Sequence, residues 1–232
     1  MTEPLAPGFP DRSLAASARV RDALSALLTE ARLAARWHGL SKDSRTAHRR
    51  ILRAFLDQGR PPGAATISAE VIADLSARDL VHVREGEIAV AYPFAAKATD
   101  FAVTVGNVRL HAVCAVDALG VAAMAGRDAR VSCLCPVCRG AVDLTVFADG
   151  LTHAGASRPA ARVWTGVMAV GPCAADSQCK SMRLFCCAEH LEIWREGQPD
   201  MPGFDLSLAE GIQLGAAIFR PFLEDGSSEV QP

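Results

Sequence analysis

Apolar side chains in the first eighty residues recur at intervals of three and four, the spacing of one face of a helix. The pattern predicts a helix over about 13–37, a second that ends at Gly59, and a third over about 68–78. Apolar and polar positions then alternate over 81–92 around Glu85-Gly86, which predicts a short hairpin. Three helices followed by a hairpin is the element order of a winged-helix module.

The charge of this N-terminal segment bears on whether such a module binds DNA. Residues 11–60 carry eleven Lys and Arg against five Asp and Glu, a net charge of +6. The third helix, which would be the recognition helix, has Glu70 and Asp74 but only Arg78 as a basic residue. Phosphate contacts require Lys and Arg on such a surface. We therefore interpret the segment as a packing module and do not expect a nucleic acid partner.

The pattern changes to strands after Lys97. Apolar positions alternate over 101–105 and 108–113 around Gly106-Asn107, a strong two-residue hairpin signal. Pairing Val105 with Val108 places the apolar side chains of both strands on one face. A short helix closed by a glycine is expected next, then three strands and two helices, over about 115–125, 129–133, 141–147, 161–170, 187–196 and from Ser207 onward.

These elements predict an α+β fold, in which an N-terminal winged-helix-like module packs on a domain with a mixed or antiparallel sheet. The expected segments are a loose N-terminus, the helical module, the sheet domain and a loose C-terminus, at 1–12, 13–95, 96–223 and 224–232. The 232 residues are 50% hydrophobic and 22% charged, which excludes wholesale disorder. A formal net charge of −2 gives no reason to expect a polyanionic partner.

How the eight cysteines are interpreted depends on the cellular compartment, because disulfides form in oxidising compartments. The sequence contains no run of about 18 apolar residues, so it predicts no membrane-spanning helix. The first four residues, Met1–Pro4, lack the basic and apolar regions of a signal peptide. We therefore expect a cytoplasmic protein whose cysteines are thiols or metal ligands rather than disulfides. All eight lie between Cys114 and Cys187, so this segment is expected to hold the chemistry.

Cys114 lies where a predicted strand meets the N-terminus of a helix, and Asp117 follows three residues later. A helix N-terminus favours the thiolate form of a cysteine. The spacing points both side chains to one face of the first turn. The pair would combine a ligand for soft metals with an acid or base. The alternative is a buried structural cysteine beside an acidic residue that stabilises the helix start.

Two further groups of cysteines follow. Cys186 and Cys187 are adjacent, with His190 close behind. On a strand they would point to opposite faces, so one would face a site and the other the core. In the remaining group, Cys135 and Cys138 have the spacing of half a zinc knuckle, and Cys173 and Cys179 could complete a second metal site. The alternative is a loop of free thiols. The whole group is Cys133, Cys135, Cys138, Cys173 and Cys179.

Three stretches, in their order and spacing, resemble the organomercurial (alkylmercury) lyase family: Arg109–Leu119, Gly126–Ser132 and Phe185–Cys187. The winged-helix-like N-terminal segment agrees, because the family places such a module before its catalytic region. The resemblance covers about 45–223 and is strongest in 101–147 and 184–188. One departure is Val113, where the family usually has a tryptophan before its first catalytic cysteine.

The resemblance implies roles for individual residues. Cys114 and Cys186 match the two catalytic cysteines, which hold mercury, and Asp117 matches the catalytic aspartate. Cys135 matches a further, non-catalytic cysteine, and Cys187 is the neighbour of the second catalytic one. The family cleaves the carbon–mercury bond of a small organomercurial by protonolysis. It releases a hydrocarbon and Hg²⁺, which passes to cellular thiols or a mercuric reductase. A thiol reductant for product release is implied, with no required cofactor besides a structural zinc if the second site exists.

Other classes of function remain open at this point. One is a metal-binding or metal-sensing protein of the same fold without lyase activity, whose cysteines bind mercury, zinc or copper. In its regulatory form the winged helix would bind DNA. Another is a lyase-like protein that has lost its activity and only buffers thiophilic metals. The weakly basic third helix favours the enzyme over the regulator.

Overall fold

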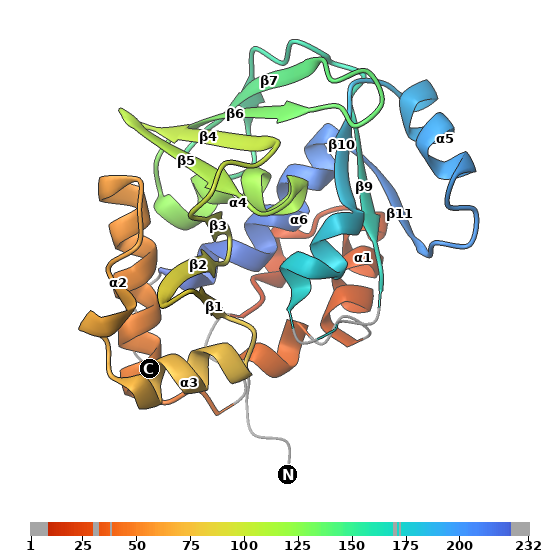
Figure 1. The fold of residues 1–232 in the computed structure, drawn as a ribbon. Helices are drawn as coiled ribbons and strands as arrows, with labels where there is room; N and C mark the ends of the chain where they lie inside the picture. Colours follow the sequence, from red (N-terminus) through yellow and green to blue (C-terminus); the bar gives the residue numbers. More distant parts are fainter. Residues whose placement is uncertain (1–8, 30–32, 38, 169–170, 172, 224–232) are drawn as a thin grey trace, which may run out of the picture.

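Two antiparallel sheets and six α-helices make up the part of the chain that the computed structural model describes, which is residues 9–29, 33–37, 39–168, 171 and 173–223 (Figure 1). The α+β class expected from the sequence is therefore confirmed. The expected loose C-terminus lies outside the described residues, as do residues 1–8. Phe9, which was expected in the loose N-terminus, is buried and stacks on Trp37.

The N-terminal third is helical, with α1 at Ala18–Thr29, α2 at Lys42–Gln58 and α3 at Ala69–Ala77. The single helix expected over 13–37 is instead α1 flanked by short 3₁₀ turns. The hydroxyl of Ser41 accepts a hydrogen bond from the N–H of Ser44 and caps α2. At the other end Gly59 adopts the left-handed conformation, with φ of 73°.

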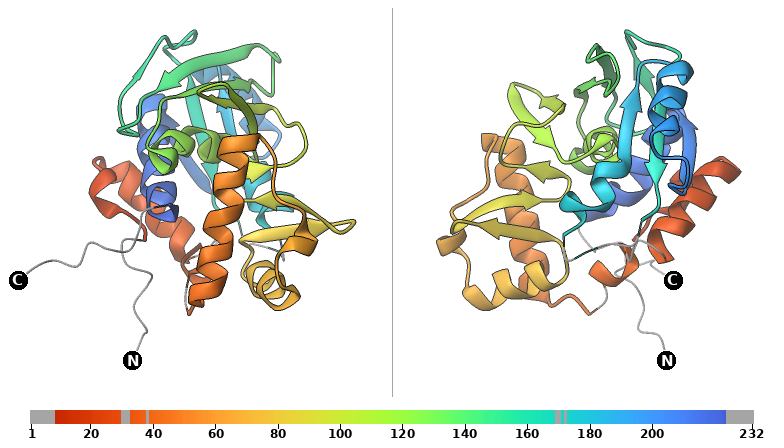
Figure 2. Two further views of the ribbon diagram at one scale, coloured as in Figure 1. Left: turned by 90° about the vertical axis from the view of Figure 1, so that its left-hand side faces the viewer. Right: turned by 45° about the vertical axis from the view of Figure 1, so that its right-hand side comes forward.

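The hairpin after α3 is present, as β1 (Val81–Arg84) and β2 (Glu87–Ala91). It joins a larger sheet of order β1-β2-β3-β5-β4-β6-β7-β8. The sheet therefore runs without a break across the boundary that was expected after residue 95, and α2 packs along the same part of it (Figure 2). The other strands are β3 at Phe94–Ala95, β4 at Phe101–Val105, β5 at Val108–Ala112, β6 at Ala129–Leu134, β7 at Ala141–Val146 and β8 at His153–Ala154.

The register of β4 and β5 confirms the hairpin prediction, since Val105 pairs with Val108 and Val103 with Leu110. A second, three-stranded sheet has the order β10-β9-β11. Its strands are β9 at Arg162–Gly166, β10 at Met182–Phe185 and β11 at Gly203–Ser207. The pattern predicted only β9, because β10 has four residues and β11 contains Gly, Asp and Ser, which are poor strand formers.

Helices α4 (Ala115–Ala125) and α6 (Leu208–Phe219) cross closely in the core, and α5 (Ala188–Glu196) lies at the periphery. Almost every residue of α4 is buried, as expected for a helix that is apolar all round. The crossing depends on two glycines: a Cβ on Gly120 would lie 2.6 Å from the carbonyl oxygen of Gly215. α4 also contacts strands of both sheets.

His48 on α2 is the most unusual buried polar residue of the helical part. Its ring lies against Trp37 and Phe222, and neither ring nitrogen has a hydrogen-bond partner among the described residues. Burial, with a smaller effect of the Arg49 charge, lowers the pKa of His48 to about 3. The side chain is therefore neutral in the folded protein at neutral and mildly acidic pH.

This burial predicts a pH dependence of stability. Between about pH 6 and 4 an unfolded histidine takes up a proton and the folded one does not, so stability falls as the pH falls. We expect the free energy of unfolding of the wild type to drop, relative to His48→Leu, by up to about 1.4 kcal/mol per pH unit in this range. Urea unfolding of both proteins at several pH values measures the difference, and parallel curves would contradict the expectation.

Candidate active site

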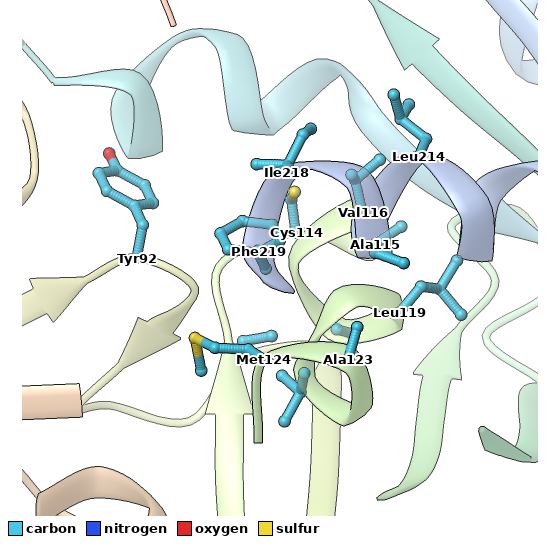
Figure 3. Close-up of a cluster of buried hydrophobic side chains, with 14 of the residues drawn as sticks. Tyr92, Cys114, Ala115, Val116, Leu119, Ala123, Met124, Leu214, Ile218 and Phe219 are labelled. Atoms are coloured by element: carbon cyan, nitrogen blue, oxygen red, sulfur yellow. The ribbon is translucent and has the colours of Figure 1, made fainter. Parts of the chain in front are cut away.

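Cys114 lies two residues after the end of β5 and is the N-cap of α4, where its backbone is extended. The N–H of Asp117, in the first turn of α4, donates to its Sγ at 3.4 Å. Both side chains are buried, with 0% of Cys114 and 5% of Asp117 exposed. Figure 3 shows Cys114 at the start of α4, beside Ile218 and Phe219 of α6. The expected one-face arrangement of Cys114 and Asp117 is present.

A third side chain completes this group, and it is Cys179. Cys179 lies in a 3₁₀ turn, Gln178–Ser181, immediately before β10, and is 7% exposed. Its Sγ, the Sγ of Cys114 and a carboxylate oxygen of Asp117 all lie within 4.8 Å of one another. The Sγ of Cys114 also donates to the thioether of Met182 at 3.5 Å. The site therefore gathers soft sulfur atoms around one carboxyl group.

Burial governs the protonation of this group. It raises the pKa of Asp117 to about 7, and Oδ2 has no hydrogen-bond partner among the described residues. Burial, a hydrogen bond with Cys179 and the Asp117 charge raise the pKa of Cys114 well above its ordinary value. The hydrogen bond with Cys114 acts to lower the pKa of Cys179, but burial and Asp117 raise it overall. The resting site thus holds two thiols beside a carboxyl that can gain or lose a proton near neutral pH.

A cavity of about 40 Å³ opens onto the group, and both Cys179 and Asp117 line it. Cys114 is not part of the lining. Arg36 and Tyr92 supply polar atoms to the wall. Most of the wall is apolar and comes from the helical part and α6 as well as α4: Leu27, Leu33, Leu80, Val116, Ile218 and Phe222.

A polar network borders the cavity and contains Cys173. Asp79 pairs with Arg36 and His82, each at 2.5 Å, and accepts a hydrogen bond from the hydroxyl of Tyr92 at 3.2 Å. Cys173 lies 3.9 Å from the same hydroxyl and forms a group with Asp79 and His82. The carboxylate oxygens of Asp79 are thus already engaged by protein donors, which favours a supporting role over metal binding.

The other cysteines lie elsewhere. Cys186 follows β10 and groups with Cys135, Cys138 and His190, whose ligand atoms also lie within 4.8 Å of one another. Burial acts to raise the pKa of Cys135, but backbone N–H groups of Cys138, Cys186 and Val137, with His190, outweigh it and lower the pKa to about 6. Burial and the neighbouring thiols of Cys138 and Cys135 raise the pKa of Cys186 to about 12.

The structure therefore groups the predicted residues differently from the expectation. Cys186 is not in the group of Cys114 and Asp117, where Cys179 stands instead. The five cysteines expected to share a second site are separated: Cys133 is buried on β6, Cys173 borders the cavity, and Cys135 and Cys138 join Cys186.

The family model described as MerB, alkylmercury lyase, matches residues 94–220, more than half of the chain. The chain belongs to the alkylmercury lyase family. The match begins at β3 and ends after α6, and therefore contains all three members of the Cys114 group.

The fold of this alkylmercury lyase family member is similar to that of a solved structure. It is described as the crystal structure of the mercury-bound form of MerB2, and it is similar with a TM-score of 0.70 and 21% sequence identity. The likeness covers 90% of this chain and 100% of that chain, so it extends into the N-terminal helices.

Among the described residues, no helix is long and apolar enough to span a membrane.

Proposed function

We propose that this member of the alkylmercury lyase family cleaves the carbon–mercury bond of small organomercurials by protonolysis, using Cys179, Cys114 and Asp117. One observation carries the assignment: two thiols and a carboxyl group, all buried, lie within 4.8 Å of one another, and one of the thiols and the carboxyl group line a largely apolar cavity. This proposal replaces Cys186, which the family resemblance implied as the second thiolate, with Cys179.

Capture is the first step. An organomercurial reaches the site as R–Hg–SR′, bound to a cellular thiol. Cys179, which lines the cavity, exchanges with that thiol, so a bond from mercury to Cys179 forms and the bond to R′S breaks. The proton of Cys179 leaves on R′SH. The exchange is favourable because thiolates are soft ligands that select soft cations.

Cleavage follows when Cys114, whose Sγ lies within 4.8 Å of that of Cys179, adds a second sulfur to the mercury. Its proton passes to Asp117, whose pKa of about 7 lets it accept and release a proton near neutral pH. The second thiolate raises electron density on the carbon, and Asp117 delivers the proton to that carbon. The carbon–mercury bond breaks, R–H leaves, and Hg²⁺ remains between the two sulfurs. Both thiol protons are thus accounted for, one on R′SH and one on R–H.

The surroundings support this sequence of steps. The apolar wall accommodates a hydrocarbon group and keeps water away, which raises the pKa of Asp117. External thiols then remove Hg²⁺ by exchange, so a thiol reductant is needed for repeated turnover. Cellular thiols or a mercuric reductase are the proposed acceptors.

The N-terminal helices have a place in the same proposal. We infer that residues 13–95, with α1, α2, α3 and the β1–β2 hairpin, form a winged-helix-like module that serves packing. Arg36 and Leu80, which lie outside the residues matched by the family model, contribute to the cavity wall from this part of the chain. The module therefore closes the site from one side, a role that needs no contact with DNA.

The purified protein with an organomercurial and excess thiol tests the function. Phenylmercury should yield benzene and methylmercury methane, with more than one hydrocarbon per protein and an equal amount of Hg²⁺. A protein that binds both compounds with the carbon–mercury bond intact would instead be a metal-binding protein of the same fold, the alternative function.

A further inference from the structure

The connection between β6 and β7 is folded around two sulfur atoms. In this turn the N–H of Cys135 donates to the carbonyl of Gly140 at 3.0 Å, and the N–H of Arg139 to the carbonyl of Cys135 at 2.9 Å. Arg139 adopts a left-handed conformation, with φ of 60°. The N–H of Gly140 donates to the Sγ of Cys138 at 3.4 Å.

The backbone N–H groups of Val137 and Cys138 point to the Sγ of Cys135. A turn whose amides converge on the sulfurs of a Cys-x-x-Cys pair stabilises thiolates, the form in which cysteine binds metals. The pair at Cys135 and Cys138 thus has the backbone of one half of a zinc site.

The other half comes from the start of α5. Cys186 directly follows β10, and His190 lies four residues on, within the first turns of the helix. The Sγ of Cys186 is 2.9 Å from Nδ1 of His190. Cys187 stands between them as the N-cap of α5 and is not part of the group.

The distances between ligand atoms of the two halves match those of a tetrahedral zinc site. With Zn–S of about 2.3 Å and Zn–N of about 2.0 Å, a regular tetrahedron has S–S edges of about 3.8 Å and S–N edges of about 3.5 Å. The Sγ atoms of Cys138 and Cys186 are 3.8 Å apart. The Sγ of Cys135 and Nδ1 of His190 are 3.5 Å apart.

We propose that Cys135, Cys138, Cys186 and His190 together bind one structural Zn²⁺ ion. Four protein ligands close the coordination shell, which is the mark of a structural rather than a catalytic zinc site. The ion would tie the β6–β7 connection to the start of α5. Such a tie would add to the packing beneath α5, where the described residues form a small cluster separate from the main core: Cys135, Trp164, Phe185 and Leu191.

Metal analysis of the full-length protein, purified without chelator and never exposed to mercury, tests the site. We expect about one zinc per chain in the wild type. Cys138→Ser should lower the zinc content severalfold or more. Cys187→Ser is the matched control, since it removes the adjacent thiol outside the group, and it should keep its zinc. Zinc-free wild type after incubation with Zn²⁺, or full zinc in Cys138→Ser, would overturn the proposal.

Cobalt substitution covers the case in which Cys138→Ser fails to fold. Wild type loaded with Co²⁺ should show the intense visible bands of a tetrahedral ion and the near-ultraviolet bands of thiolate ligation. The weak bands of an octahedral ion would overturn the proposal. Neither readout involves an organomercurial, so failure of the zinc site and failure of the proposed lyase activity are separate results.

Discussion

Replacing Asp117 with asparagine is expected to slow hydrocarbon release by about 10²–10⁴-fold, the usual contribution of general acid catalysis. The amide has nearly the shape of the carboxyl group but cannot accept a thiol proton and pass it to carbon. Oδ2 of Asp117 has no hydrogen-bond partner among the described residues, so the change removes no bond at that atom. Capture of the organomercurial depends on sulfur and should change little.

Two measurements on Asp117→Asn separate these steps: equilibrium binding of phenylmercury and single-turnover release of benzene. Asp143→Asn, the same change at an exposed position on β7, is the matched control and should behave like the wild type. If Asp117→Asn releases benzene at the wild-type rate, Asp117 only stabilises the start of α4.

The second large effect is expected at Cys179. Cys179→Ser should lose hydrocarbon release by roughly 10³-fold or more, as when a nucleophile is removed from an enzyme. It should also lose capture, because Cys179 lines the cavity and a serine hydroxyl is a harder ligand that is not ionised at neutral pH. Cys114→Ser should lose release to a similar extent but still capture the organomercurial through Cys179. Binding and single-turnover assays on both variants measure the difference.

The effect of replacing Cys186 shows whether Cys179 or Cys186 supplies the second catalytic thiolate. On our proposal, Cys186→Ser and Cys138→Ser belong to the same zinc site, so their effects on hydrocarbon release should be equal and smaller than that of Cys179→Ser. If Cys186→Ser abolishes release while Cys138→Ser retains it, Cys186 acts in catalysis and the assignment of Cys179 is wrong.

Local signals account for the parts of the fold that the sequence predicted well. The β4–β5 register follows from Gly106-Asn107 and the alternation around it, and α4 ends at Gly126 in the left-handed conformation, as expected. The start of α6 has the complete capping box between Ser207 and Glu210. Each of these features depends on residues within a few positions of one another.

The partner of Cys114 depends on contacts that are distant in sequence. The i, i+3 spacing places Asp117 beside Cys114, but the choice between Cys179 and Cys186 depends on where β10 begins. β10 has only four residues and pairs with β9, so no local pattern marks it. Cys186 comes after this strand and Cys179 before it, which separates them along the sheet. The adjacent pair Cys186-Cys187 resembles the family motif, but on our proposal it lies at the opposite end of β10 from the second catalytic cysteine.

The central claim is that a proton held by the buried thiol and carboxyl groups is transferred to the carbon bonded to mercury. Cleavage of phenylmercury in deuterated water, followed by mass spectrometry of the benzene, tests it most directly. Thiol and carboxyl protons exchange with solvent, so we predict benzene that carries a single deuterium. Benzene without deuterium, or phenylmercury recovered intact from the protein, would contradict the account.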